Sequence, residues 1–163
     1  ENILESEMVD VLILAETHCR GKKYEWRRNF EVLERQKNLK DKRGGGLLVA
    51  CKKREGRRIL LEDGKNEDVI KVRFEDKGFL LCLVGTYWDV SDRERNRKIE
   101  VKLRRIRRNE ERIFIFGDFN AHLEEIDGRK NWNGERLRYM TEEDRLVMCQ
   151  QIYMGEEWFG DVY

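Results

Sequence analysis

Proline is missing from all 163 residues, although proteins use it at about 5% of positions. No stretch rich in glycine or serine replaces it, so a flexible or Pro-rich linker is excluded, and the length fits one domain or most of one. The four cysteines are widely spaced without a CxxC pair, and Cys51 and Cys82 sit in apolar runs. We therefore expect small, buried free thiols in a reducing compartment rather than two disulfides.

Long apolar runs are also missing, and the longest falls far short of the ~20 residues that span a bilayer. The acidic start of the sequence lacks the basic region of a signal peptide. We therefore expect no membrane association and an intracellular location, nuclear or cytoplasmic. Thirty-four Lys and Arg balance 33 Asp and Glu, so an electrostatic argument about partners has to be local.

Short apolar runs separated by turn signals predict a chain built mainly of strands. Their predicted ranges are 9–15, about 30–33, 47–52, 57–62, 69–75, 79–87, 113–116 and 146–153. Asp76-Lys77-Gly78 predicts a hairpin turn with Gly78 at positive φ. Ile99, Leu103 and Ile106 follow the period of a helix over 93–108, and a second helix fits 134–144. This order predicts a layered α/β (α+β) domain with antiparallel or mixed sheets.

The sequence FIFGDFNAH at 114–122 is typical of a strand that delivers polar groups at its end. Gly117 lets the backbone turn sharply or approach a ligand closely. In extended geometry Asp118 and Asn120 point the same way, which brings a carboxylate and a carboxamide together. Such a pair suits metal-assisted phosphodiester hydrolysis, whereas a simple turn is an equally good reading of these residues alone.

Two other apolar strands also deliver a polar residue at their ends. The run VLILAETHC delivers Glu16, and the run FLLCLVGTYWDV delivers Tyr87. A strand-end glutamate is a natural ligand for Mg²⁺, which keeps several waters and needs few protein groups. Three strands that each end in a functional group predict a site at one edge of a sandwich.

The order of these motifs resembles the endonuclease/exonuclease/phosphatase superfamily, over nearly the whole chain. The motifs are AETHC, GGGLLVACKK, TYWDV, a basic helix and GDFNAH. Together with NWNGERLRYMTEEDRLVM at 131–148, they are similar to the apurinic-endonuclease-like endonuclease domain of non-LTR retrotransposons. The resemblance implies a two-sheet α/β sandwich and a phosphodiesterase that nicks DNA with Mg²⁺, or Mn²⁺, and no small-molecule cofactor.

The resemblance also implies a role for each site residue. Glu16 would bind the metal, and Asp118 would orient or deprotonate the attacking water. Asn120 would help to hold the phosphate. Tyr87 would contact the phosphate or steady the leaving oxygen.

Two parts of the family pattern are missing, which leads us to expect an incomplete sandwich. One is an N-terminal strand ending in Asn, and the other is a C-terminal segment with an Asp-His pair. The family's proline after the tyrosine is replaced by Trp88-Asp89-Val90. We therefore expect a single domain over 1–163 that is a fragment with weak or no activity. The alternatives are a non-catalytic remnant that binds nucleic acid or a partner, and a phosphoinositide or sphingomyelin phosphodiesterase.

Four further residues are candidates for contacts with nucleic acid: His122, Arg129, Lys130 and Trp88. Each also has an explanation without nucleic acid. The first three can be ordinary residues of a loop or turn, and Trp88 can pack inside the protein. The helix at 93–108 carries nine basic and two acidic residues, a local charge of +7. A phosphate track and a solvated outer face both explain such a helix.

Overall fold

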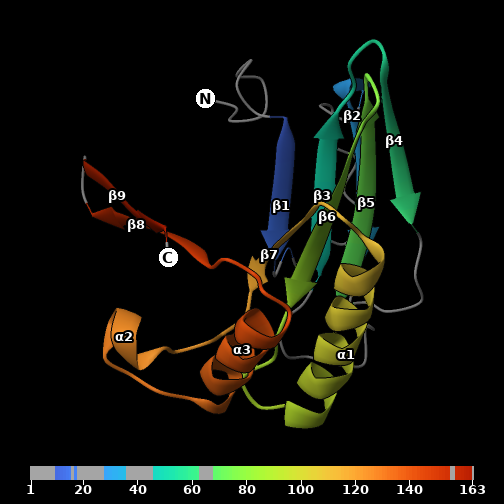
Figure 1. Ribbon diagram of the computed structural model, residues 1–163. Coiled ribbons are helices and arrows are strands. Elements are labelled where there is room, and N and C mark those ends of the chain that lie inside the picture. The colour runs from blue at the N-terminus through green and yellow to red at the C-terminus, as the bar shows by residue number, and fades with distance from the viewer. Residues whose placement is uncertain are drawn as a thin grey trace. The chain divides into compact units, whose positions relative to one another are not determined.

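The computed structural model describes residues 10–15, 17, 28–35, 46–62, 68–154 and 157–162 (Figure 1). The chain divides into two compact units, residues 1–120 and residues 121–163, which we describe separately. Within the described residues the first unit holds β1 (Val11–Ala15), β2 (Phe30–Arg35), β3 (Leu47–Lys52), β4 (Arg57–Glu62), β5 (Val69–Asp76), β6 (Phe79–Tyr87), α1 (Arg93–Asn109) and β7 (Ile113–Asp118). The second holds α2 (Glu124–Asp127), α3 (Trp132–Glu143), β8 (Cys149–Met154) and β9 (Glu157–Val162). A single domain over 1–163 stays a prediction.

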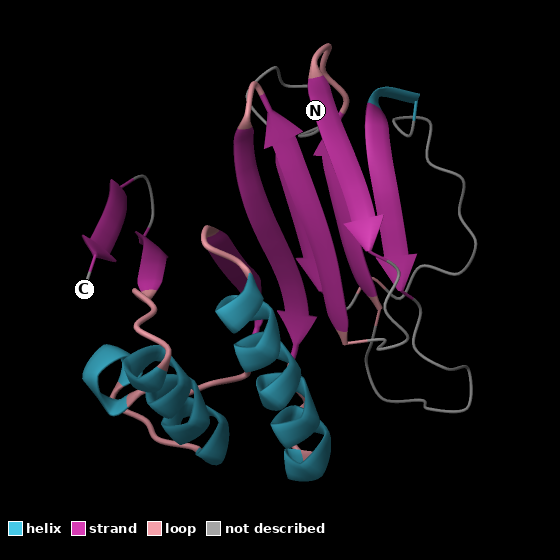
Figure 2. Ribbon diagram, turned by 45° about the vertical axis from the view of Figure 1, so that its right-hand side comes forward, coloured by secondary structure: helices cyan, strands magenta, loops and turns pink. Residues whose placement is uncertain are grey.

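The first unit contains two sheets. The smaller has the strand order β1-β3-β2 and is antiparallel throughout. The larger has the order β4-β5-β6-β7, in which β7 runs parallel to β6 and the other pairs are antiparallel. The parallel pair needs a crossover connection, and α1 provides it (Figure 2). These sheets confirm the predicted α/β sandwich with mixed pairing.

The core lies between the two sheets. It joins one face of β3, through Leu47, Val49 and Cys51, to one face of the larger sheet, where Ile70 and Val72 are buried. Burying one such aliphatic side chain stabilises the fold by about 1.5–3 kcal/mol. Cys51 and Cys82 are buried free thiols, as predicted, and burial raises the pKa of Cys51 to about 12.

The turn between β5 and β6 has the predicted hairpin geometry. Gly78 has φ 81°, and Lys77 before it is also left-handed, with φ 49°. Two successive positive φ angles are typical of the tight turns that match the twist of the flanking strands.

Helix α1 packs on the larger sheet through the predicted apolar face. Ile99, Leu103 and Ile106 are buried on it, and the Asp92 side chain caps the helix by accepting from the Arg95 N–H at 2.9 Å. At the other end of α1 the buried Glu110 carboxylate accepts from Lys71 at 2.7 Å and from Arg73 at 3.0 Å, which ties the helix to β5.

The contacts of Glu110 with Lys71 and Arg73 determine the charge state of its carboxyl group. Burial alone would raise the pKa of its carboxyl, but the hydrogen bonds from Arg73 and Lys71 outweigh burial, so the pKa is lowered. The carboxylate therefore stays charged although it is buried, because two cations hold it.

Strand β7 differs from the prediction of a short, buried strand at 113–116. It extends through Gly117 to Asp118, and its side chains alternate between half-buried and exposed. Phe114 is 54% exposed and Phe116 is 43% exposed. The cause is its position, because β7 is the last strand of its sheet and, among the described strands, pairs with β6 alone.

In the second unit α3 begins at its predicted place within two residues. The Asn131 side chain caps it by accepting from the Gly134 N–H at 2.8 Å. Strands β8 and β9 form an antiparallel pair, and β8 begins at Cys149 rather than at residue 146. Among the described residues, no helix has the length and apolar character that crossing a membrane requires.

Candidate active site

The ends of three strands of the first unit meet at one edge of the sandwich. Figure 1 shows the arrowheads of β1 and β6 at the same edge, and β1 contacts both β6 and β7. Because β6 and β7 are parallel, their carboxyl ends lie side by side. Tyr87 and Asp118, the last residues of the two strands, are direct register partners. Two residues that are 31 positions apart in sequence thus lie on adjacent strands, about 4.8 Å apart.

Gly85 shows which face of the sheet these residues occupy. A Cβ atom on Gly85 would lie 3.3 Å from Ile13 of β1 and 3.4 Å from Val49 of β3, so Gly85 faces the smaller sheet. Side chains two residues apart in a strand share a face, and register partners do too. Tyr87 and Asp118 therefore lie on the face directed toward the smaller sheet, whose strand β1 ends at Ala15. Glu16, the predicted metal ligand, follows Ala15 but lies outside the described residues.

Gly117 has a structural role that differs from the predicted sharp turn. A Cβ atom there would lie 2.0 Å from the backbone oxygen of Thr86 on β6. The glycine lies within β7 and does not make a turn; a close approach to a ligand stays a prediction. It allows β7 to approach β6 closely just before the two strands end, which sets the spacing of Tyr87 and Asp118.

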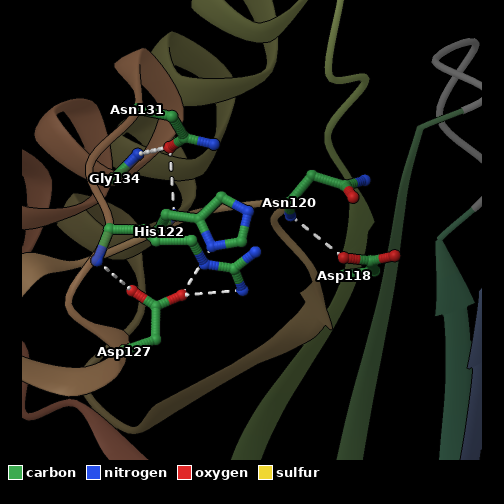
Figure 3. A network of polar contacts seen from close by, with 7 residues as sticks. Asp118, Asn120, His122, Asp127, Asn131 and Gly134 are labelled. Atoms are coloured by element: carbon green, nitrogen blue, oxygen red, sulfur yellow. Dashed lines mark hydrogen bonds and ion pairs between the residues drawn. The ribbon is translucent and has the colours of Figure 1, made fainter.

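The Asp118 carboxylate is exposed at this edge. Its Oδ1 accepts from the Asn120 N–H at 2.9 Å (Figure 3). Among the described residues no hydrogen bond or ion pair is found for Oδ2. Asp118 thus offers a carboxylate oxygen held in place by its neighbour, which suits a group that orients a water molecule.

Asn120 does not continue the extended geometry that would align it with Asp118. The strand ends at Asp118, and Asn120 is left-handed with φ 45°. Its Nδ2 donates to the backbone oxygen of Trp88 at 2.8 Å, and the Trp88 N–H donates to the backbone oxygen of Asp118 at 2.9 Å. These two bonds tie the loop after β7 to the loop after β6. A contact of Asn120 with phosphate stays a prediction.

Trp88 packs inside the protein rather than presenting a face to a base. It is fully buried, and its ring meets Phe119 edge-on, with centroids 5.3 Å apart. The stacking hypothesis for Trp88 was therefore wrong. The reason is that the loop after β6 turns the indole inward, where its large apolar surface is removed from water.

Two buried polar residues that sequence reasoning missed hold the end of β6 in place. The backbone oxygen of Asp68 accepts from the Tyr87 N–H at 3.2 Å, and its carboxylate holds Arg95 of α1, at 2.6 Å from Nε. Asn96 of α1 makes two bonds with the backbone of Asp89, at 2.6 and 2.9 Å. A sequence signal existed for Asn96, because it lies on the same helical face as Ile99 and Leu103, where a polar residue needs a partner.

In the second unit His122 is part of a separate polar network. Its Nδ1 lies 2.5 Å from Oδ2 of Asp127, and its N–H donates to Asn131 Oδ1 at 3.0 Å (Figure 3). The hydrogen bond with His122 lowers the pKa of Asp127. Arg129 and Lys130 form exposed ion pairs with Asp127 and Glu135, at 3.4 and 3.3 Å. Contacts of these three basic side chains with nucleic acid stay predictions.

The site fits a hard divalent cation in chemical type. Hard divalent cations prefer carboxylate oxygens as ligands, and Mg²⁺ in particular keeps several of its bound waters. Asp118 supplies one exposed carboxylate. Within the described part of the chain no group of three or more His, Cys, Asp or Glu comes together, and Glu16 falls outside that part.

Comparisons with known proteins agree with this architecture. Among solved structures, the chain is similar to the endonuclease domain of TRAS1, a telomere-specific non-LTR retrotransposon. The TM-score is 0.64 at 12% identity, over 93% of this chain and 68% of that domain. It is also similar to the catalytic domain of human nocturnin, with a TM-score of 0.59 at 16% identity, over 86% of this chain and 58% of nocturnin's. No curated protein sequence matches the chain.

At these sequence identities the structural similarity shows only that the chain shares its fold with the two solved proteins. The family-level comparison reaches further, because the profile of the endonuclease/exonuclease/phosphatase family matches residues 1–161. The paired ends of β6 and β7 and the GDFN segment at the end of β7 agree with this match. This chain therefore belongs to the endonuclease/exonuclease/phosphatase family.

Proposed function

We propose that the chain is a Mg²⁺-dependent phosphodiesterase of the retrotransposon-endonuclease type, which nicks DNA with weak activity. The observation that carries the proposal is the parallel register that sets Tyr87 beside Asp118 at the end of the sandwich. The family is one of nucleases and phosphatases, and the likeness to a retrotransposon endonuclease domain favours DNA among its substrates. We also propose an intracellular setting, which the buried free thiols support.

In this proposal Asp118 acts on the attacking water. Its Oδ1 is engaged by the Asn120 N–H, so the carboxylate has a fixed direction, and Oδ2 orients or accepts a proton from the water. Tyr87, on the adjacent strand, contacts the phosphate or steadies the leaving oxygen. Mg²⁺, or Mn²⁺, held by Glu16 would neutralise charge on the phosphate when bound.

The bonds between Trp88, Asp118 and Asn120 act by positioning. Because they link the loops after β6 and β7, Tyr87 and Asp118 keep their separation when substrate arrives. Preorganised groups of this kind lose little free energy to reorganisation during the reaction.

A second candidate is a non-catalytic remnant that binds nucleic acid or a partner. It is favoured by the hydrogen bond from Asn120 Nδ2 to the Trp88 backbone oxygen, which uses one of the two N–H donors expected to hold phosphate. It differs from the first candidate in needing neither Asp118 nor a metal.

Nicking of supercoiled plasmid tests the proposal. We expect relaxed circles with Mg²⁺, none with EDTA, and a rate at least about 100-fold lower for Asp118→Ala. Glu111→Ala is the matched control, since Glu111 is an exposed acid two residues before β7 begins, and it should keep the wild-type rate. Nicking that survives Asp118→Ala would reject the assigned role. No nicking by a folded wild-type chain would favour the remnant.

A further inference from the structure

Helix α1 carries a row of exposed cations on the side that faces away from its sheet. Arg97, Arg105 and Arg108 are exposed, while Ile99 and Leu103 on the opposite side are buried. At 100° per residue, Arg97 and Arg108 point in nearly the same direction, three turns apart, and Arg105 lies within one turn of Arg108. We call these three residues the outer basic face of α1.

The two acids of α1 are not paired with Arg105 or Arg108. Glu100 is buried, with 3% of its surface exposed. Glu94, the other acid within the helix, is paired with Lys98 at 2.8 Å. Among the described residues no hydrogen bond or ion pair is found for Arg105 or Arg108. Arg105 and Arg108 therefore present their positive charge to solvent.

One end of the outer basic face is anchored beside the candidate active site. The helix begins six residues after Tyr87, and Arg95 in its first turn is bound to Asp68, whose backbone oxygen also holds the Tyr87 N–H. The 17 residues of α1 extend for about 25 Å. Duplex DNA rises 3.4 Å per base pair, so this length corresponds to roughly seven base pairs.

From these observations we propose that the outer basic face of α1 binds the phosphate backbone of duplex DNA, as a docking surface that extends away from the site of cleavage. The choice of partner rests on the proposed function. The helix contains no aromatic residue, so it offers no platform for stacking unpaired bases. Val101 is the only apolar residue exposed on it, which is too little apolar surface for a helix that lies in a membrane interface.

Such a surface would act through charge and not through base recognition. Each phosphate contact releases counterions, so each makes the slope of log K against log salt concentration more negative by about 0.9. Two arginines that contact phosphate should together account for roughly 1.8 of that slope. Binding through α1 should be independent of DNA sequence, and specificity would come from other parts of the protein.

The test measures binding of the full chain to duplex DNA in the presence of EDTA. Fluorescence anisotropy of a labelled 30-base-pair DNA reports the binding, at salt concentrations between 50 and 200 mM. The variant is Arg105→Gln/Arg108→Gln. The matched control is Arg58→Gln/Lys77→Gln, which removes the same charge at exposed positions of β4 and the β5–β6 turn. We expect the α1 variant to bind at least tenfold more weakly at 100 mM salt, with a salt slope smaller in magnitude by about 1.8, and the control to bind like wild type.

Equal weakening by the two double variants would overturn the proposal, because it would mean that only net charge matters. So would wild-type chain that fails to bind the duplex, or that binds anionic vesicles of phosphatidylserine and phosphatidylcholine in preference to it. Circular dichroism melts check that both variants are folded. Asp118→Ala should lose nicking and keep duplex binding with an unchanged slope, so failure of the nuclease proposal is told apart from failure of this one.

Discussion

Residue 117 has to be glycine for a reason that concerns two strands at once. A methyl group at Gly117 would lie 2.0 Å from the Thr86 oxygen, far inside contact distance. The oxygen belongs to the backbone of β6 and cannot rotate away as a side chain would. Relief therefore requires that β6 and β7 move apart at the end that carries Tyr87 and Asp118.

We predict that Gly117→Ala lowers the free energy of unfolding by about 2–4 kcal/mol, because overpacking against backbone is costly. Urea denaturation measures the change. Gly78→Ala is the control: it has open space but φ 81°, so it should cost only about 1–2 kcal/mol. If the two variants lose the same stability, the close approach of β6 and β7 is not what requires glycine at 117.

At the scale of the element, α1 is fixed to the sheet by polar groups as well as by its apolar face. Asn96 is buried and bonds both the N–H and the oxygen of Asp89. This contact shapes the loop between β6 and α1, and hence the surroundings of Tyr87. Removing the side chain would leave two backbone groups of Asp89 without their partners.

We predict that Asn96→Ala destabilises the fold by about 2–3 kcal/mol, although alanine favours helix more than asparagine does. Thermal or urea unfolding measures the loss. Val101→Ala, at a position that is 67% exposed on the same helix, should change stability by less than about 0.5 kcal/mol. A neutral Asn96→Ala would show that water replaces the lost bonds.

The elements themselves were largely predictable from local pattern. The ranges 47–52, 57–62 and 79–87 agree with β3, β4 and β6, since each apolar run matches one strand. The burial of β7 was not predictable, because IFIF reads the same in a central strand and in an edge strand. Only the order of strands in the sheet, which depends on the whole chain, distinguishes the two.

The candidate site was predictable in its residue types but not in its contacts. The spacing of Asp118 and Asn120 suggested a shared direction, which the left-handed backbone at Asn120 removes. Its carboxamide meets the Trp88 oxygen, 32 positions away in sequence, and Trp88 itself is drawn inward. Contacts of this kind depend on tertiary structure, and a local pattern carries no information about them.

At the scale of the whole molecule, β7 is the last strand of the larger sheet among the strands that the structure describes, and it carries exposed apolar side chains. Phe114 and Phe116 are exposed and stack on each other, with ring centroids 5.9 Å apart. An edge strand with unpaired backbone groups and exposed aromatic side chains favours pairing between molecules. The protein should therefore associate as its concentration rises.

We predict that Phe114→Lys reduces this association, because a charge on an edge strand opposes pairing. Light scattering across a series of protein concentrations measures it. Val101→Lys introduces the same charge at an exposed apolar residue of α1 and should have little effect. If both variants reduce association equally, net charge and not the edge of β7 controls it.

The bonds that link the loops after β6 and β7 have a consequence for the kinetics of opening. The Trp88 amide hydrogen is held by the Asp118 oxygen, and Trp88 in turn holds Asn120. Exchange of this one amide with deuterium therefore requires the end of β7 at Asp118 to separate from Trp88, which follows β6. The exchange rate of this amide therefore reports how readily the assembled site opens, and it can be measured in the resting protein without substrate or metal.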